Sequence, residues 1–194
     1  AGGNPLGGGA RTAGGEAIPA SVPARFMLAA AMDPWPGGYF GDPSRECHCT
    51  PPMIQRYVSK ISGPLLDRID IHIEVPAVKY KELRAPGLAE DSESVRSRVI
   101  AARERQIKRY RGEKKTYSNA QMLPKMLRKH FTISPEGEKL LENAITRLGL
   151  SARAHDRILK VARTIAELES AEDIAPKHLS EAIQYRTLDR SYWA

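Results

Sequence analysis

The sequence predicts an α/β segment, with the last strands of a parallel sheet, followed by an all-α helical domain. Three observations predict this: the apolar run 26–32 ends at Asp33-Pro34, isoleucines alternate with polar residues at 69–75, and apolar residues then recur at helical spacing towards the end of the chain. The predicted boundaries are 1–22 for a tail, 23–80 for the α/β segment, 81–120 for a linker with a basic helix, and 121–194 for the helical domain.

Composition limits the class of protein. Of the 194 residues, 41% are hydrophobic and 27% charged, which is typical of a soluble globular chain. The longest apolar run is too short to cross a bilayer and no secretory leader opens the chain, so we expect a cytoplasmic protein without a membrane partner. Residues 1–22 hold seven of the fifteen glycines and few large apolar side chains, so we expect a flexible tail there.

The elements of the α/β segment follow in chain order. The run 26–32 suits a buried strand of a parallel sheet. Thr50-Pro51 supplies an N-cap and a proline at the first helical position, and apolar residues at helical spacing continue to Ile61. Ser62-Gly63-Pro64 ends this helix. The alternation at 69–75 predicts a strand with one buried face.

The helical domain contains a long basic helix at 93–111 and three further helices. The first of these starts at Ser134-Pro135 and stops at Gly149, the second is capped by Ser151, and the third opens at Pro176. Their inward residues are expected to be Leu140, Leu141, Ala144, Ile145, Leu148, Ile158, Ala162, Ile165, Leu168, Leu179, Ala182 and Ile183. We therefore expect a helical bundle that folds without the α/β segment.

Arg153 is the first candidate functional residue. It lies in the opening turn of the helix capped by Ser151, where the exposed N–H groups disfavour a cation by roughly 0.3–1 kcal/mol. An anion such as a phosphate, held by the helix end and the guanidinium together, would explain its presence. A solvated arginine, or one paired with Asp156, is the alternative that the local pattern favours.

Arg68 is the second candidate. It follows the Gly63-Pro64 turn and precedes the predicted strand at 69–75, and strand ends in α/β folds are where ligands and partners are usually met. An arginine there could reach a phosphate on a neighbouring subunit. The alternative, which the local pattern favours, is an intramolecular pair with Asp67 or Asp70.

The basic helix is the candidate nucleic-acid surface. Residues 94–115 carry nine Lys or Arg against two acids, which accounts for the whole net charge of +7. Arg98, Arg105 and Arg109 are predicted to form an outward stripe that could follow phosphates. The opposite, apolar sector of this helix contains Val95, Val99, Ala102 and Ile107. Arg96 and Arg103 also fall in this sector, so we predict that they bond to neighbouring elements. A merely solvated helix face remains open as the alternative.

Other chemistry is poorly supported by the sequence. Cys47-His48-Cys49 is one compact pair of thiols, whereas tetrahedral zinc needs four ligands, so we expect reduced, metal-free cysteines. The chain contains no Gly-Lys-Ser/Thr and no apolar strand ending in Asp-Glu, so the phosphate-binding loop and the usual magnesium acids are missing from these 194 residues.

Three stretches together resemble the magnesium-chelatase-like AAA+ ATPases of the ComM/YifB type. They are Pro23–Leu28 through Gly38–Asp42, the run Ser62–Pro76 (SGPLLDRIDIHIEVP), and Leu150–Arg153 through Ala162–Ala166; Ala182–Arg186 also fits. The resemblance covers about residues 22–190. The run Ser62–Pro76 is specific to this group and separates it from the true chelatase subunit.

The resemblance implies an α/β remnant of an AAA+ core followed by a helical lid. It also implies that Phe26–Met32 leads to the sensor-1 position, that Arg68 is an arginine finger acting in trans, and that Arg153 is the sensor-2 arginine. Members of this family are hexameric ring motors that use ATP and Mg²⁺, and the ComM type is linked to DNA branch migration. A homo-oligomeric ring and DNA are therefore the implied partners of the complete family protein.

The sequence departs from the family pattern at two places. The sensor-1 position, normally asparagine, is Asp33, and a carboxylate beside the γ-phosphate would repel it. The family's Cys-Pro-Cys is Trp35-Pro36-Gly37, so half of a four-cysteine cluster is missing. This second departure agrees with the expectation of metal-free thiols.

We predict that this chain alone neither hydrolyses ATP nor binds it tightly, because the groups that hold phosphates and magnesium are missing from it. Phosphate release by the purified chain, with ATP and Mg²⁺, should equal that of a buffer control. Magnesium-dependent turnover above background that is lost in Arg153→Ala would contradict this.

Overall fold

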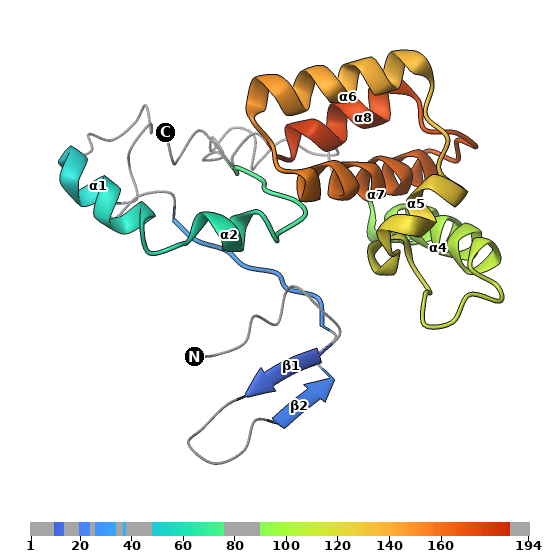
Figure 1. Cartoon of the computed structure of the whole chain (residues 1–194), viewed down its shortest axis with the longest axis horizontal. Coiled ribbons are helices and arrows are strands. Elements are labelled where there is room, and N and C mark those ends of the chain that lie inside the picture. Colours follow the sequence, from blue (N-terminus) through green and yellow to red (C-terminus); the bar gives the residue numbers. More distant parts are fainter. Residues whose placement is uncertain are drawn as a thin grey trace. The chain divides into compact units, whose positions relative to one another are not determined.

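The computed structural model describes residues 10–13, 20–23, 26–33, 37, 48–75 and 90–186, and within these the protein is mostly helical (Figure 1). The chain divides into two compact units, residues 1–69 and 70–194. The second unit contains the helical domain. No described helix is long and apolar enough to cross a membrane.

The described part of the first unit contains two short strands and two helices. Strand β1 (Ala10–Ala13) pairs antiparallel with β2 (Ala20–Pro23), within the stretch that we expected to be a flexible tail. Helix α1 (Pro51–Val58) begins after Thr50, as predicted, and α2 (Gly63–Leu66) follows the Ser62 turn. The hydroxyl of Tyr57 in α1 donates to the carbonyl oxygen of Asp33 at 2.8 Å, which fixes the end of the segment 26–33.

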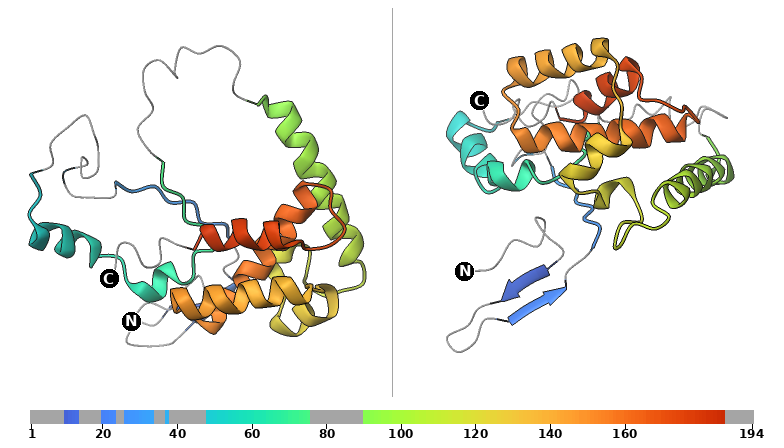
Figure 2. Two further views of the ribbon diagram at one scale, coloured as in Figure 1. Left: turned by 90° about the horizontal axis from the view of Figure 1, so that it is seen from above. Right: turned by 45° about the vertical axis from the view of Figure 1, so that its right-hand side comes forward.

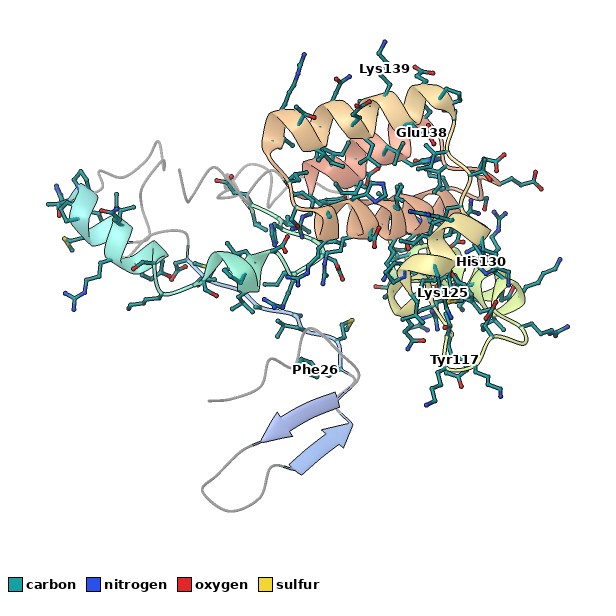
Figure 3. All side chains as sticks on the ribbon, viewed as in Figure 1. Phe26, Tyr117, Lys125, His130, Glu138 and Lys139 are labelled. Atoms are coloured by element: carbon teal, nitrogen blue, oxygen red, sulfur yellow. The ribbon has the colours of Figure 1, made fainter. Side chains whose placement is uncertain are left out.

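The parallel sheet that we expected is not present among the described residues. Residues 26–33 and 71–75 form no strand, and large apolar side chains there are exposed, including Phe26 (54%; Figure 3) and Ile73 (66%). The physical reason is that a strand needs main-chain partners, and neither segment lies beside another described strand. The main-chain N–H of His72 donates instead to the carbonyl oxygen of Tyr185 at 3.0 Å.

The second unit is built around one central helix (Figures 1 and 2). Helix α7 (Ala152–Leu168) packs against α8 (Pro176–Gln184), α4 (Ser92–Arg109), α5 (Pro124–His130) and the short 3₁₀ helix η1 (Asn119–Gln121). Helix α6 (Pro135–Leu148) lies against α8. The helical character that the sequence predicts for this part of the chain is confirmed, and α4 and η1, which we had assigned to a linker, also pack on α7.

Local sequence signals determine where these helices begin and end. The Ser134 hydroxyl accepts a hydrogen bond from the Gly137 N–H at 3.1 Å, and the Asp91 carboxylate caps α4 through the Ser94 N–H at 2.7 Å. Helix α6 ends at Gly149, whose φ of 53° is left-handed, as the predicted glycine stop requires. Capping thus explains the confirmed boundaries.

The apolar core lies between α5, α6, α7 and α8. At its centre Ile158, Ala162 and Leu179 are fully buried. All twelve residues that we predicted to face inward on α6, α7 and α8 are buried or half-buried. A Cβ on Gly137 would lie 2.6 Å from Ile133 and 2.9 Å from Leu179, so α6 and α8 approach closely only because this position has no side chain.

A buried polar cluster joins α4 and η1 to α7. The Glu167 carboxylate, with no exposed side-chain surface, forms ion pairs with Arg109 and with Arg163. It also accepts hydrogen bonds from the side-chain amides of Gln106 and Asn119, both at 2.9 Å. Because all four of these partners donate to one carboxylate, Glu167 holds three separate segments together.

We predict that Glu167→Gln lowers the free energy of unfolding by about 3–5 kcal/mol, because it leaves the buried Arg163 and the half-buried Arg109 without their carboxylate. Urea denaturation followed by circular dichroism measures this. Glu104→Gln, an exposed glutamate on α4, is the matched control and should change stability by less than about 0.5 kcal/mol. Equal stability of the two variants would show that the cluster does not hold the fold.

Candidate functional site

Arg153 is exposed at the start of α7, and no described side chain pairs with it. The Ser151 hydroxyl caps the helix by accepting the Ala154 N–H at 3.2 Å, and the first turn holds no acid. Asp156, the acid that could have neutralised Arg153, contacts the His155 ring instead at 3.0 Å. The guanidinium therefore lies next to the positive end of a helix, and no described acid neutralises it.

Arg68 lies in the turn after α2 and is half-buried. Its Nη1 donates to the carbonyl oxygen of Pro64 at 2.5 Å, so the side chain folds back on its own turn. Asp70, one of the acids that we considered as its partner, forms an ion pair with Arg157. Asp33, at the predicted sensor-1 position, is exposed and lies in the same unit as Arg68.

The segment 70–75 is attached to the helical domain rather than to a sheet. Asp70 pairs with Arg157 of α7, and His72 bonds to the end of α8 through its main chain. Lys160, one turn further along α7, lies close to this pair, and burial lowers its pKa. Sequence analysis missed Arg157 and Lys160, because only the arrangement of α7 against the segment reveals them.

The predicted orientation of α4 is wrong for Arg105 and Arg109, whereas Ala102 is buried as predicted. Its buried residues are Ala102 and Gln106, and the half-buried Arg105 and Arg109 share this inward face. Arg105 donates to the carbonyl oxygen of Ala171 at 3.1 Å, while Arg109 pairs with Glu167. Residues three or four apart lie on the same face of a helix, and this spacing places Arg105 and Arg109 on the face of Ala102 and Gln106.

Of the other arginines of α4, Arg98 is exposed as predicted, whereas Arg96 and Arg103 differ from the prediction. Arg98 pairs with Glu90 at 2.7 Å and is 53% exposed. Arg96 and Arg103 are exposed, and so are Val99 (44%) and Ile107 (57%). Apart from the buried Ala102, the sector that we had assigned to packing therefore faces outward, and neither Arg96 nor Arg103 is bonded to another described element.

Exposed cations gather where α4 passes into α5. We call this surface the basic end, and its residues are Lys108, Arg111, Lys114, Lys115, Lys125, Arg128 and Lys129. Between residues 105 and 135 the single acid is Glu113, which pairs with Lys129 at 2.7 Å. Burial lowers the pKa of the neighbouring His130 below its usual range, which disfavours the charged form of its ring.

No described residues form a cluster of three or more side chains able to hold a metal ion. Cys49 is half-buried and forms no disulfide, whereas Cys47 lies outside the described residues. The metal-free state of the thiols stays a prediction.

Two family profiles match the chain. The family described as "Magnesium chelatase, subunit ChlI C-terminal" matches residues 89–186, and "Magnesium chelatase, subunit ChlI" matches residues 5–83. The first match contains α4 together with the helices that pack around α7. The second includes most of the glycine-rich stretch that we expected to be a tail.

Curated relatives agree with these matches. The chain is 43% identical over 178 residues to the uncharacterized protein YifB of Salmonella typhimurium, and 41% identical over 170 residues to the competence protein ComM of Haemophilus influenzae. These alignments cover 88% and 87% of the chain and 32% of each relative. The chain thus spans about a third of the length of these relatives. With one profile matching half of its residues and a second matching most of the remainder, the chain belongs to the magnesium chelatase subunit ChlI family and is a homologue of YifB and ComM.

Proposed function

We propose that this chain is part of an ATP-driven AAA+ motor that remodels DNA. In it, Arg153 contacts the nucleotide of its own subunit and Arg68 contacts that of a neighbour in a homo-oligomeric ring. The relative named a competence protein motivates the DNA part of the proposal. The residues that would bind Mg²⁺ and the β- and γ-phosphates are not among these 194.

The observation that carries the proposal is the environment of Arg153. An exposed cation at the N-terminus of α7, with no counter-ion among the described residues, is locally unfavourable, and an anion bound there would make the electrostatic interaction favourable. A guanidinium can bind two phosphate oxygens at once, which suits a γ-phosphate. Arg153 and Arg157 lie one turn apart on α7, so the helix that would sense nucleotide also binds Asp70.

The position of Arg68 supports its action on a neighbour. Asp70, two residues further, is fixed to α7, and the Arg68 side chain is held by the Pro64 carbonyl oxygen. A movement of α7 that follows nucleotide binding would pull on Asp70 and hence on the turn that carries Arg68. Such a link would couple nucleotide binding in one subunit to the position of its Arg68, which contacts the nucleotide of the neighbouring subunit.

We predict that both arginines are needed for ATP hydrolysis by a chimera in which this chain replaces the matching third of the Haemophilus influenzae relative. Arg68→Ala should lower the turnover number at least 10³-fold, the size expected for an arginine finger. Arg153→Ala should also abolish hydrolysis. Arg56→Ala, an exposed arginine in the last turn of α1, is the control and should leave the rate unchanged.

Mixing experiments separate action in trans from a folding defect. Subunits with Arg68→Ala should regain activity when they are mixed with subunits whose phosphate-binding loop is inactivated, because each supplies what the other lacks. An Arg68→Ala chimera as active as the Arg56→Ala control would show that Arg68 is no arginine finger.

A further inference from the structure

The basic end is one continuous surface although its residues come from three segments. The turn after α4 is joined to α5 by the ion pair between Glu113 and Lys129, and by the Tyr110 and His130 rings, whose centroids are 5.7 Å apart. The Thr116 hydroxyl also contacts the Met126 sulfur at 3.8 Å. Figure 3 shows Tyr117, Lys125 and His130 at this same end of the helical domain.

Folding does not account for the charge of this surface. Lys108, Arg128 and Lys129 lie in the last turns of α4 and α5, where a cation complements the helix dipole. Arg111, Lys114, Lys115 and Lys125 lie elsewhere, and none of their side chains has a hydrogen-bond or ion-pair partner among the described residues. Like charges on one surface repel, so this arrangement costs stability unless an anion binds there.

An aromatic ring lies among these cations. Tyr117 is 61% exposed, and its main-chain N–H donates to the Gln121 side chain at 2.8 Å, which fixes the backbone while leaving the ring in solvent. Gly112, with a φ of 93°, makes the turn after α4, and Lys114 and Lys115 lie between this turn and Tyr117 in the chain. A positively charged track with an exposed aromatic ring is what single-stranded nucleic acid requires, because phosphates bind the cations and any base can stack on the ring.

We propose that the basic end binds single-stranded nucleic acid, with Lys114, Lys115 and Lys125 on phosphates and Tyr117 stacked on a base. The proposal rests on the proposed action on DNA and assigns that contact to a surface of the lid. The inward face of α4 takes no part, since Arg105 and Arg109 are bonded within the fold. Duplex DNA offers the cations the same phosphates but offers Tyr117 no free base.

The test uses the purified chain and a fluorescent thymidine 20-mer, titrated at several salt concentrations. Lys114→Gln with Lys115→Gln and Lys125→Gln should lower the slope of log K against log salt by about 2, at roughly 0.7 per lost phosphate contact. The matched control, Arg56→Gln with Lys60→Gln and Lys139→Gln, removes three exposed cations elsewhere and should leave the slope unchanged. Circular dichroism verifies that both variants are folded.

Tyr117 supplies a second, salt-independent readout. Tyr117→Ala should weaken binding of the 20-mer about tenfold without altering the slope, whereas Tyr117→Phe should bind normally. Equal slopes for the two triple variants, or unchanged binding by Tyr117→Ala, would overturn the proposal. Equally tight binding to phosphatidylserine vesicles through the same three lysines would overturn it too. Because ATP hydrolysis by the chimera is measured separately, failure here leaves the roles of Arg68 and Arg153 standing.

Discussion

The buried carboxylate of Glu167 is the constraint on which the arrangement of the helical domain depends. A charge without solvent requires full neutralisation, and here Arg109 and Arg163 supply it while Gln106 and Asn119 satisfy the remaining oxygen lone pairs. These partners come from α4, α7 and the segment containing η1. Their positions around one carboxylate therefore fix how α4 lies on α7.

This constraint determines which face of α4 packs on α7. The packed face in turn determines which cations of α4 are exposed to solvent. With Gln106 and Arg109 turned inward, Arg96 and Arg103 face solvent. At the end of α4 the hydroxyl of Tyr110 donates to the Asn119 side chain at 2.6 Å, which anchors the turn that carries the basic end. The proposed nucleic-acid contact and the stability of the helical domain thus involve different arginines and lysines of the same basic segment.

Sequence analysis recovered the features that depend on neighbouring residues. Ser134, Ser151 and Gly149 mark helix ends through contacts within one turn, and each lies where it was predicted. The apolar stripes of α6, α7 and α8 were predicted for the same reason. Family membership was also recognised, because the run Ser62–Pro76 is specific even where it forms no strand.

Features that depend on distant partners could not be predicted. A strand at 69–75 requires neighbours that the described residues do not provide, and the same segment binds α7 and α8 instead. The three arginines 98, 105 and 109 were assigned outward because charge usually faces water, although their spacing places them on one face with Ala102. Only the buried position of Glu167, distant in sequence, explains why Arg109 turns inward.

Hydrogen exchange across α4 and α7 tests this account most directly. If Glu167 makes α4 an integral part of the helical domain, the amides of residues 102–109 should exchange only through global unfolding, at the same free energy as those of residues 158–166. If α4 is instead a linker beside an independent bundle, its amides will exchange orders of magnitude faster while those of α7 remain protected. That second result would contradict the central role of Glu167. It would also contradict the orientation of α4 on which the exposure of the basic end depends.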